Sequence, residues 1–201
     1  MEPIQTPKSF TRRLRSLFTR GKTLRNIPRL PTLPNAEKYN AAGSVFTDGK
    51  LILAGYQPKK RKPFISGIGG GKEPGETYRD TALRETLEEL FEFKEIPEKL
   101  KQDIHTNIIP EKLVQSNTYI MVVYNFQNLE KMLSLVKKHK MVSPLYDTIP
   151  STLFDLMFKR KLNVGSPELS HLALLPLVKH SPGIPFVDAY FIEDMPLLLN
   201  K

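Results

Sequence analysis

Several residue types and segments are missing from this chain, and each absence narrows the kind of protein that it encodes. The 201 residues contain no cysteine, which excludes disulfides and thiolate zinc sites and allows a reducing compartment. No apolar run approaches the roughly 20 residues that a membrane-spanning helix needs, and the N-terminus lacks the apolar centre of a secretory signal. We therefore expect an intracellular protein without a transmembrane segment, and we favour the cytoplasm.

Acidic residues are scarce at the N-terminus. Residues 1–30 hold eight lysines and arginines against the single acid Glu2, a net charge of +7, which leaves only +2 for the other 171 residues. Residues 27–38 contain three prolines and are typical of an extended linker. The hydrophobic fraction of 40% is ordinary for a globular protein. The sequence thus predicts a basic arm with its linker over residues 1–38 and one domain over residues 39–201.

The basic arm has three interpretations. One is a solvated or partner-ordered tail that contacts nucleic-acid phosphates, another is a mitochondrial transit peptide, and the third is a charged tail that only aids solubility or docks on the domain. The first is favoured and makes RNA the expected partner. Its candidate binding residues, in the arm and in the basic loop at 58–63, are Arg12, Arg13, Arg15, Arg20, Lys59, Lys60, Arg61 and Lys62.

The pattern of apolar residues predicts a mixed α/β layer architecture. Residues 39–57 contain two apolar runs joined by Asp48 and Gly49, which is a strong hairpin signal. The other expected elements are strands at 64–71, 116–126 and 168–178, helices at 76–91, 128–140 and 151–162, and a strand or helix at 186–199.

The helix expected at 76–91 carries an unusual group of carboxylates. At 100° per residue, Glu85, Glu88 and Glu89 fall on one face and leucines occupy the opposite face. Like charges three and four residues apart repel each other, which costs an isolated helix roughly 0.2–0.5 kcal/mol per pair. A magnesium ion would offset this repulsion, because it takes carboxylate ligands and leaves other positions to water and substrate phosphates. The alternative is a solvated, glutamate-rich face.

The spacing of one glycine, one arginine and four glutamates favours the metal site. In chain order, separated by five, seven, zero, two and zero residues, they are Gly70, Glu76, Arg84, Glu85, Glu88 and Glu89. This pattern resembles the Nudix box, G-x5-E-x7-R-E-U-x-E-E-x-G-U, in which U is a bulky apolar residue. All six strict positions match, and the glycines follow an expected strand and precede an expected helix.

Three positions depart from the Nudix pattern. Thr86 occupies the first apolar slot and is small enough to pack, and Glu92 occupies the last apolar slot. Phe91 replaces the glycine that allows the turn at the end of the helix, a conformation that is unfavourable for a residue with a β-carbon. We therefore expect the helix to continue for a further turn, toward Pro97.

The resemblance implies a fold, a chemistry and metal ligands. Nudix hydrolases cleave nucleoside diphosphates linked to another group, and the similarity covers roughly residues 39–126, so the expected fold class is a Nudix-type α/β/α sandwich with a mixed sheet. It implies that Glu85, Glu88 and Glu89 bind Mg²⁺ or Mn²⁺, with the carbonyl of Gly70 as a further ligand. The bound ion would polarise a phosphoryl oxygen and lower the pKa of an attacking water.

The same resemblance implies roles for further residues. Arg84 would pair with a carboxylate of the box and fix its orientation, and Glu76 would stabilise the loop before the helix. Glu168 resembles the distal glutamate that many members carry ahead of a late strand, with Glu130 as the second candidate. Either a glutamate of the box or an acid from a later loop would accept the proton from water.

The sequence says less about the substrate. No dinucleotide or coenzyme A signature follows the box, and the basic arm and loop favour a long polyanion. The favoured substrate is therefore the 5′ end of RNA, including removal of its cap, and the aromatic residues available for base stacking are Tyr39, Tyr56, Phe64 and Tyr119. The alternatives are a pyrophosphatase of small nucleotides and a degenerate Nudix fold that binds nucleic acid or serves as a structural module.

Overall fold

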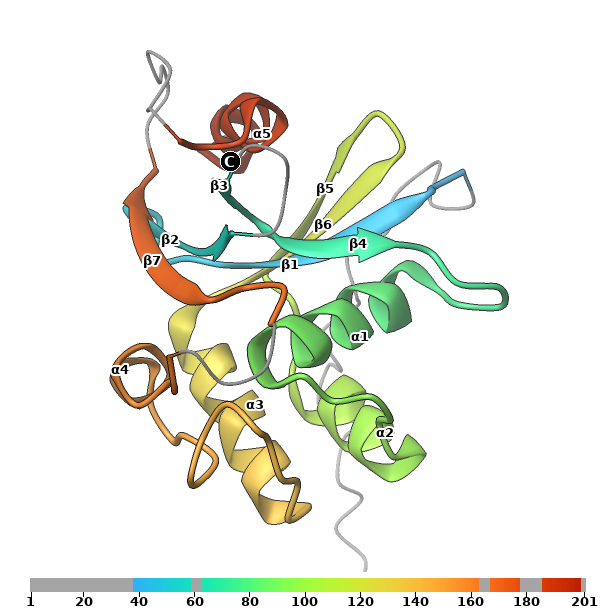
Figure 1. Ribbon diagram of the computed structural model, residues 1–201. Helices are drawn as coiled ribbons and strands as arrows, with labels where there is room; N and C mark the ends of the chain where they lie inside the picture. The colour runs from blue at the N-terminus through green and yellow to red at the C-terminus, as the bar shows by residue number, and fades with distance from the viewer. Residues whose placement is uncertain (1–37, 59–62, 163–166, 178–185, 200–201) are drawn as a thin grey trace, which may run out of the picture. The chain divides into compact units, whose positions relative to one another are not determined.

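The computed structural model describes residues 38–58, 63–162, 167–177 and 186–199. The predicted basic arm and the candidate residues Arg12, Arg13, Arg15, Arg20, Lys59, Lys60, Arg61 and Lys62 lie outside the described residues. The described part contains seven strands and five helices (Figure 1): β1 (Ala41–Phe46), β2 (Leu51–Gln57), β3 (Phe64–Ser66), β4 (Ile68–Gly71), α1 (Tyr78–Phe91), α2 (Glu98–Asn107), β5 (Lys112–Ser116), β6 (Tyr119–Tyr124), α3 (Phe126–Lys138), α4 (Leu153–Phe158), β7 (His171–Pro176) and α5 (Ala189–Leu199).

The strands form two sheets. In the four-stranded sheet, ordered β4-β1-β6-β5, β1 and β6 run parallel and the other pairs run antiparallel, so we call it the mixed sheet. The antiparallel sheet has the order β3-β2-β7. Helices α1, α2 and α3 cover one face of the mixed sheet and α5 covers the other (Figure 1). The expected α/β/α sandwich with a mixed sheet is confirmed.

Alternation along β6 explains why the mixed sheet has helices on both faces. Ile120 and Val122 belong to the core that the sheet shares with α1, α2 and α3. Met121 and Val123 point the other way and pack in a second core, to which α5 contributes Phe191. Successive side chains of a strand point to opposite faces, so an uninterrupted apolar strand must be covered on both.

The turn at Asp48 and Gly49 forms, but the expected hairpin does not. The Asp48 carboxylate accepts hydrogen bonds from the N–H groups two and three residues later, at 2.8 and 2.7 Å, and Gly49 has a φ of 83°. After one bridge between Thr47 and Ile52 the strands separate, and β1 enters the mixed sheet while β2 enters the antiparallel sheet. Both strands are buried along most of their length, so other parts of the fold cover both faces of each.

The single strand expected at 64–71 is also divided between the sheets. β3 ends at Ser66 in the antiparallel sheet, and β4 begins at Ile68 at the edge of the mixed sheet. Gly67 joins them, with the ring of Phe191 about 3.0 Å from the position that its β-carbon would take. The glycines of β4 therefore lie on the edge strand of the mixed sheet.

The expected extension of α1 toward Pro97 is wrong. The helix ends at Phe91, and Glu92 takes a left-handed conformation with φ 57° and ψ 37°. A left-handed residue with a β-carbon costs roughly 1–2 kcal/mol, but Phe91 is fully buried and its ring stacks on Phe93 with centroids 5.1 Å apart. Burial of this aromatic pair fixes the end of the helix where the Nudix pattern has glycine.

Candidate functional site

Local hydrogen bonds and apolar packing set the start and the rotation of α1. The Thr77 hydroxyl accepts the N–H of Asp80 at 3.3 Å, and the Asp80 carboxylate accepts the N–H of Thr77 at 3.1 Å, which together make a capping box. Leu83, Leu87 and Leu90 are buried in the core. Since leucines hold one face against the core, Glu85 and Glu89 turn toward the β4 edge, where they meet Gly70 and Gly69.

Arg84 is the centre of the charged network on α1. Its Nε donates to Glu76 at 2.8 Å, while Nη1 donates to Glu85 at 2.8 Å and to Glu88 at 3.0 Å. Its Nη2 donates to the carbonyl of Gly71 at 2.7 Å. Burial would lower the pKa of Arg84, but the hydrogen bonds to Glu76 and Glu85 outweigh this effect and raise the pKa. The guanidinium thus holds two candidate metal ligands and ties them to the glycine strand.

Glu76 holds the loop that leads into α1. Its carboxylate accepts the backbone N–H of Glu73 at 3.0 Å and the hydroxyl of Thr81 at 2.8 Å. Burial raises the pKa of Glu76, but the hydrogen bonds from Arg84 and from these two groups outweigh burial and keep the pKa low. The hydroxyl of Tyr39 donates to the carbonyl of Glu76 at 2.7 Å. Tyr39, one of the four aromatic residues considered for base stacking, is therefore engaged in holding this loop.

Gly70 leaves room for a carboxylate. A β-carbon at this position would lie 2.5 Å from the carboxyl carbon of Glu85 and 2.5 to 2.6 Å from its two oxygens. Any side chain here would displace Glu85 from the strand edge. Burial raises the pKa of Glu85, the hydrogen bond from Arg84 opposes that rise, and the charges of Glu88 and Glu168 add to it.

Glu89 is the most deeply buried acid of the group. Its side chain reaches the strand edge, where Oε2 accepts the N–H of Gly69 at 2.9 Å, and the residue is only 4% exposed. Burial, together with repulsion from Glu168, Glu85 and Glu88, raises the pKa of Glu89 to about 9. In the metal-free protein this carboxyl group therefore holds a proton at neutral pH.

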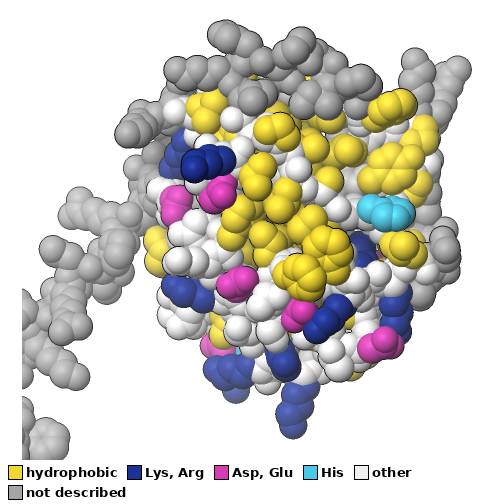
Figure 2. Space-filling model, turned by 90° about the vertical axis from the view of Figure 1, so that its left-hand side faces the viewer, with side chains coloured by type: hydrophobic (Ala, Val, Ile, Leu, Met, Phe, Trp, Pro, Cys, Tyr) yellow, Lys and Arg dark blue, Asp and Glu magenta, His cyan; other side chains and the backbone are white. Residues whose placement is uncertain are grey.

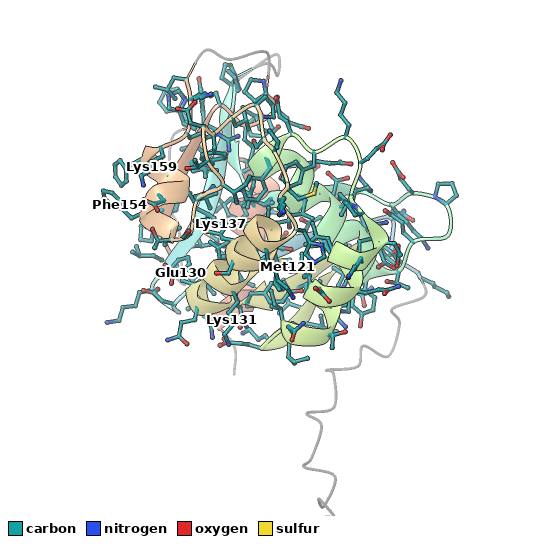
Figure 3. The ribbon with its side chains drawn as sticks, turned by 90° about the horizontal axis from the view of Figure 1, so that it is seen from below. Met121, Glu130, Lys131, Lys137, Phe154 and Lys159 are labelled. Atoms are coloured by element: carbon teal, nitrogen blue, oxygen red, sulfur yellow. The ribbon has the colours of Figure 1, made fainter. Side chains whose placement is uncertain are left out.

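Glu168 comes from the segment before β7 and faces the acids of α1. Its charge contributes to the raised pKa values of both Glu85 and Glu89. Glu130, the second candidate, lies on α3 beside α4 (Figure 3), where its carboxylate accepts the N–H of Leu153 at 3.2 Å. The structure thus brings Glu168, rather than Glu130, to the carboxylates of α1.

Arg160 joins the end of α1 to the Glu168 segment, and the sequence analysis missed it. This arginine is only 6% exposed. It donates to the carbonyls of Leu90 at 2.8 Å, Glu89 at 3.0 Å and Leu169 at 2.6 Å. A buried arginine after an amphipathic helix carries no sequence signal of its own, because its acceptors are backbone carbonyls from distant segments.

The carboxylates fit a hard divalent cation by their chemistry. Among the described residues, no three or more acidic or histidine side chains are gathered in an arrangement that could already hold a metal ion. Even so, Glu85, Glu88, Glu89 and Glu168 supply only oxygen donors, which suit Mg²⁺ or Mn²⁺. The space at Gly70 is filled by a carboxylate instead of a β-carbon, and the acids repel one another. A bound cation would take the place of the proton on Glu89 and neutralise the acids together.

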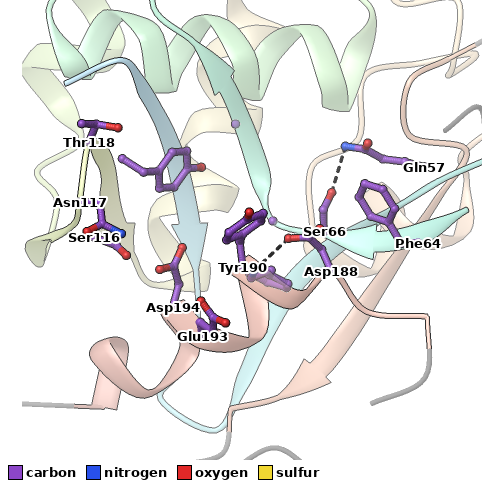
Figure 4. Close-up of a pocket in the computed structure, with 14 residues that line it drawn as sticks. Gln57, Phe64, Ser66, Ser116, Asn117, Thr118, Asp188, Tyr190, Glu193 and Asp194 are labelled. Atoms are coloured by element: carbon purple, nitrogen blue, oxygen red, sulfur yellow. Dashed lines mark hydrogen bonds between the residues drawn. The ribbon is translucent and has the colours of Figure 1, made fainter. Parts of the chain in front are cut away.

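A cavity of about 470 Å³ lies on the α5 side of the mixed sheet, and we call it the α5 pocket (Figure 4). Phe64 and Tyr119, two of the aromatic residues considered for stacking, line it, whereas Tyr56 and Tyr39 do not. Gly69 also lines it, and its φ of 155° and the Tyr119 hydroxyl, 2.3 Å from an added β-carbon, both require glycine. Because the N–H of Gly69 binds Glu89, the α5 pocket adjoins the carboxylates.

A separate apolar patch lies at the surface of α4 and β7 (Figure 2). Phe154 and Phe158 on α4 are 65% and 70% exposed, with ring centroids 4.6 Å apart. None of the six residues that match the Nudix pattern belongs to α4 or β7. Among the described helices, none is long and apolar enough to cross a membrane.

Comparisons with known proteins leave the family of this chain open. No protein-family model matches it, and no curated protein matches its sequence. A similar solved structure is a bifunctional NMN adenylyltransferase/ADP ribose pyrophosphatase from Francisella tularensis, complexed with AMP and a manganese ion. The identity is 12% and the TM-score 0.35, over 82% of this chain and 38% of that one. These values are too low to transfer an activity.

Proposed function

We propose that this protein is a Nudix-type hydrolase that cleaves a diphosphate linkage between a nucleoside and another group. The observation that carries this proposal is the gathering of acids at the Gly69–Gly70 edge, where the buried carboxyl of Glu89 accepts the N–H of Gly69 and the carboxyl of Glu85 fills the space beside Gly70. Burying acids together is costly unless they are paired or bind a metal. The match to the six strict positions of the Nudix box supports the same conclusion.

The residues of the chain would divide the chemistry among them. Glu85, Glu88 and Glu89 would hold Mg²⁺ or Mn²⁺ with the carbonyl of Gly70, and the bound ion would supply charge neutralisation and activation of water. Arg84 keeps Glu85 and Glu88 oriented through hydrogen bonds from one nitrogen.

Glu168 would serve as the general base. It is exposed and comes from a segment outside α1, so it can accept a proton from the attacking water while the acids of α1 hold the cation.

The 5′ end of RNA, including its cap, is the substrate we favour. The support is the net charge of +7 over residues 1–30, far more than a free nucleotide requires. A pyrophosphatase of small nucleotides is the second candidate, and the α5 pocket supports it equally, because about 470 Å³ accommodates a nucleoside. A degenerate Nudix fold used as a binding module is the third.

A substrate panel separates these candidates. Capped RNA, nucleoside diphosphate sugars, dinucleoside polyphosphates and nucleoside triphosphates are incubated with Mg²⁺ or Mn²⁺ and the wild type, Glu88→Gln or the exposed control Glu95→Gln. We expect Glu88→Gln to lower turnover by about 10²-fold or more and Glu95→Gln to leave it unchanged. If no substrate is hydrolysed, the third candidate, a degenerate Nudix fold that serves as a binding module, would be supported instead.

Removal of residues 1–38 tests the choice of RNA. The deletion should weaken cleavage of capped RNA and reduce its dependence on salt, because cationic contacts to phosphates are lost. Turnover of free nucleotides should not change. Faster turnover of free nucleotides than of RNA by the intact chain would exclude RNA as the preferred substrate.

A further inference from the structure

The α5 pocket has acidic groups and no basic ones. Its charged lining residues are Asp188, Glu193 and Asp194, and no lysine, arginine or histidine lines it among the described residues. Figure 4 shows these acids on and just before α5, with Ser116 at the end of β5 and Asn117 after it on the side of Asp194. Such a lining repels phosphate and attracts a group that is cationic or rich in hydrogen-bond donors.

Gln57 forms part of the wall of the pocket. The residue is only 7% exposed, and its Nε2 donates to the hydroxyl of Ser66 at 3.0 Å (Figure 4). Its Oε1 is buried and has no hydrogen-bond partner among the described residues. This oxygen is enclosed by the packed wall, so Gln57 shapes the pocket without offering the oxygen to a ligand.

Two of the three acids of the pocket, Asp188 and Asp194, lie in different surroundings. The Asp188 carboxylate accepts the N–H of Phe191 at 3.1 Å and so caps the start of α5. Asp194 is half-buried, and burial raises its pKa; a hydrogen bond with Ser116 opposes this rise, and the charges of Glu193 and Asp188 add to it. Asp194 is therefore a partly buried carboxylate that a positively charged ligand would stabilise.

Aromatic side chains give the pocket a place for a flat ring. Tyr190, from the first turn of α5, is 78% exposed, and Phe64 lies across the pocket from it (Figure 4). Exposed aromatic rings stack on nucleobases, and the attraction is stronger when the base carries a positive charge. The α5 pocket thus combines stacking surface, hydrogen-bond acceptors and negative charge.

We propose that the α5 pocket selects a cationic purine, a guanine alkylated at N7, as the base of the substrate. Asp194 would accept hydrogen bonds from the N–H groups of the base, and Tyr190 would stack on it. The shared residue Gly69 would let the attached phosphates reach the carboxylates of α1. This inference rests on the proposed function, because it names the base that the hydrolase would recognise.

Binding of nucleosides without phosphate or metal tests the pocket by itself. 7-Methylguanosine and guanosine are titrated into the full chain in the presence of a chelator and followed by NMR chemical shifts. We expect 7-methylguanosine to bind about tenfold more tightly than guanosine, because only the alkylated base carries a charge. Equal affinities of the two nucleosides would overturn the proposal.

Substitutions in the pocket test which residues produce the preference for 7-methylguanosine over guanosine. Asp194→Asn should remove most of the preference for 7-methylguanosine, while Asp147→Asn, an exposed acid paired with Lys161 outside the pocket, should leave it intact. Tyr190→Ala alters a mainly exposed side chain and should weaken the binding of both nucleosides. A preference that survives Asp194→Asn, or affinities that survive Tyr190→Ala, would overturn the proposal.

The outcomes for binding and for hydrolysis are separable. Selective binding of 7-methylguanosine without turnover of any diphosphate substrate would support the pocket and contradict the hydrolase. Turnover by a protein that does not distinguish the two nucleosides would support the hydrolase and contradict the pocket.

Discussion

The two ends of α1 are stabilised in different ways. At its start, Thr77 and Asp80 form a capping box within four residues of the chain. At its end, the carbonyls are bound from a distance: Arg160 reaches those of Glu89 and Leu90, and the hydroxyl of Ser143 donates to that of Phe91 at 2.7 Å. The first end is built by local sequence and the second by tertiary contacts.

This difference matters because the candidate metal ligands lie in the second half of the helix. Glu85 and Glu88 are held by Arg84 from within α1. The segment of Glu168, in contrast, is linked to α1 by Arg160, which donates hydrogen bonds to the carbonyls of Glu89 and Leu169. Changes at the two ends should therefore separate stability from activity.

Arg160→Met should have the largest effect. It removes the donor to the carbonyls of Glu89, Leu90 and Leu169 and leaves these buried acceptors unpaired. Each unpaired buried group costs about 1–3 kcal/mol, so we expect a loss of about 3 kcal/mol or more in the free energy of unfolding. Chemical denaturation measures this loss.

The neighbouring Lys159→Met is the matched control. Lys159 is exposed and pairs with Asp155 at 2.9 Å on the surface, where an ion pair contributes about 0–1 kcal/mol. Equal losses from Lys159→Met and Arg160→Met would show that the buried hydrogen bonds do not hold this end of the helix.

Glu89→Gln should stabilise the metal-free protein while it abolishes activity. In the folded chain burial raises the pKa of Glu89 to about 9, above its ordinary value of 4.5. Between these two values the unfolded chain loses its proton and the folded chain keeps it, so the stability of the wild type falls as the pH rises from about 4.5 to about 9. Glutamine has no proton to lose, and we expect a gain of about 1–3 kcal/mol at neutral pH.

Thermal unfolding at several pH values, with a chelator present, checks this expectation. Glu88→Gln is the comparison, because the Glu88 side chain is 37% exposed and pairs with Arg84 near solvent; it should lower activity without the gain in stability. A pH-independent difference between wild type and Glu89→Gln would contradict the buried, protonated state of Glu89.

The acidic face of α1 could be predicted because all of its residues lie in one helix with a fixed period. Glu85, Glu88 and Glu89 follow from 3.6 residues per turn and from the Nudix spacing alone. The Arg160 contacts could not be predicted in this way, because they cross 70 and 71 residues of sequence to backbone carbonyls that any residue would supply.

The same limit explains two corrections in the fold. The turn at Asp48 depends on local chemistry and forms as expected, but membership of β1 and β2 in one sheet or two depends on what covers them. The predicted end of α1 was wrong because the local sequence around Phe91 favours a helix that continues beyond it. In the structure the ring of Phe91 is buried against Phe93, and the carbonyl of Phe91 accepts a hydrogen bond from the hydroxyl of Ser143, 52 residues away. These tertiary contacts end the helix at Phe91.

Thr77→Ala should have a moderate effect at the local end of α1. It removes the oxygen that accepts the N–H of Asp80, and loss of such a cap costs about 1 kcal/mol. Turnover per folded molecule should not change, because the carboxylates are placed by the other half of the helix. Thr77→Ser keeps the oxygen and should retain both stability and activity. A fall in turnover at full folding would contradict the division between the two ends.

Glu92→Gly should have the smallest effect, and it is stabilising. Glu92 has a φ of 57°, a conformation that a β-carbon disfavours and that glycine takes freely. The gain is offset in part because glycine increases the freedom of the unfolded chain, so we expect a net increase of about 0.5 kcal/mol in the free energy of unfolding. Glu92→Ala, which removes the same carboxylate but keeps the β-carbon, should give no increase. If both variants are equally stabilised, the benefit would come from the lost charge beside the other glutamates, and backbone strain would not explain why the Nudix pattern has glycine near this end of the helix.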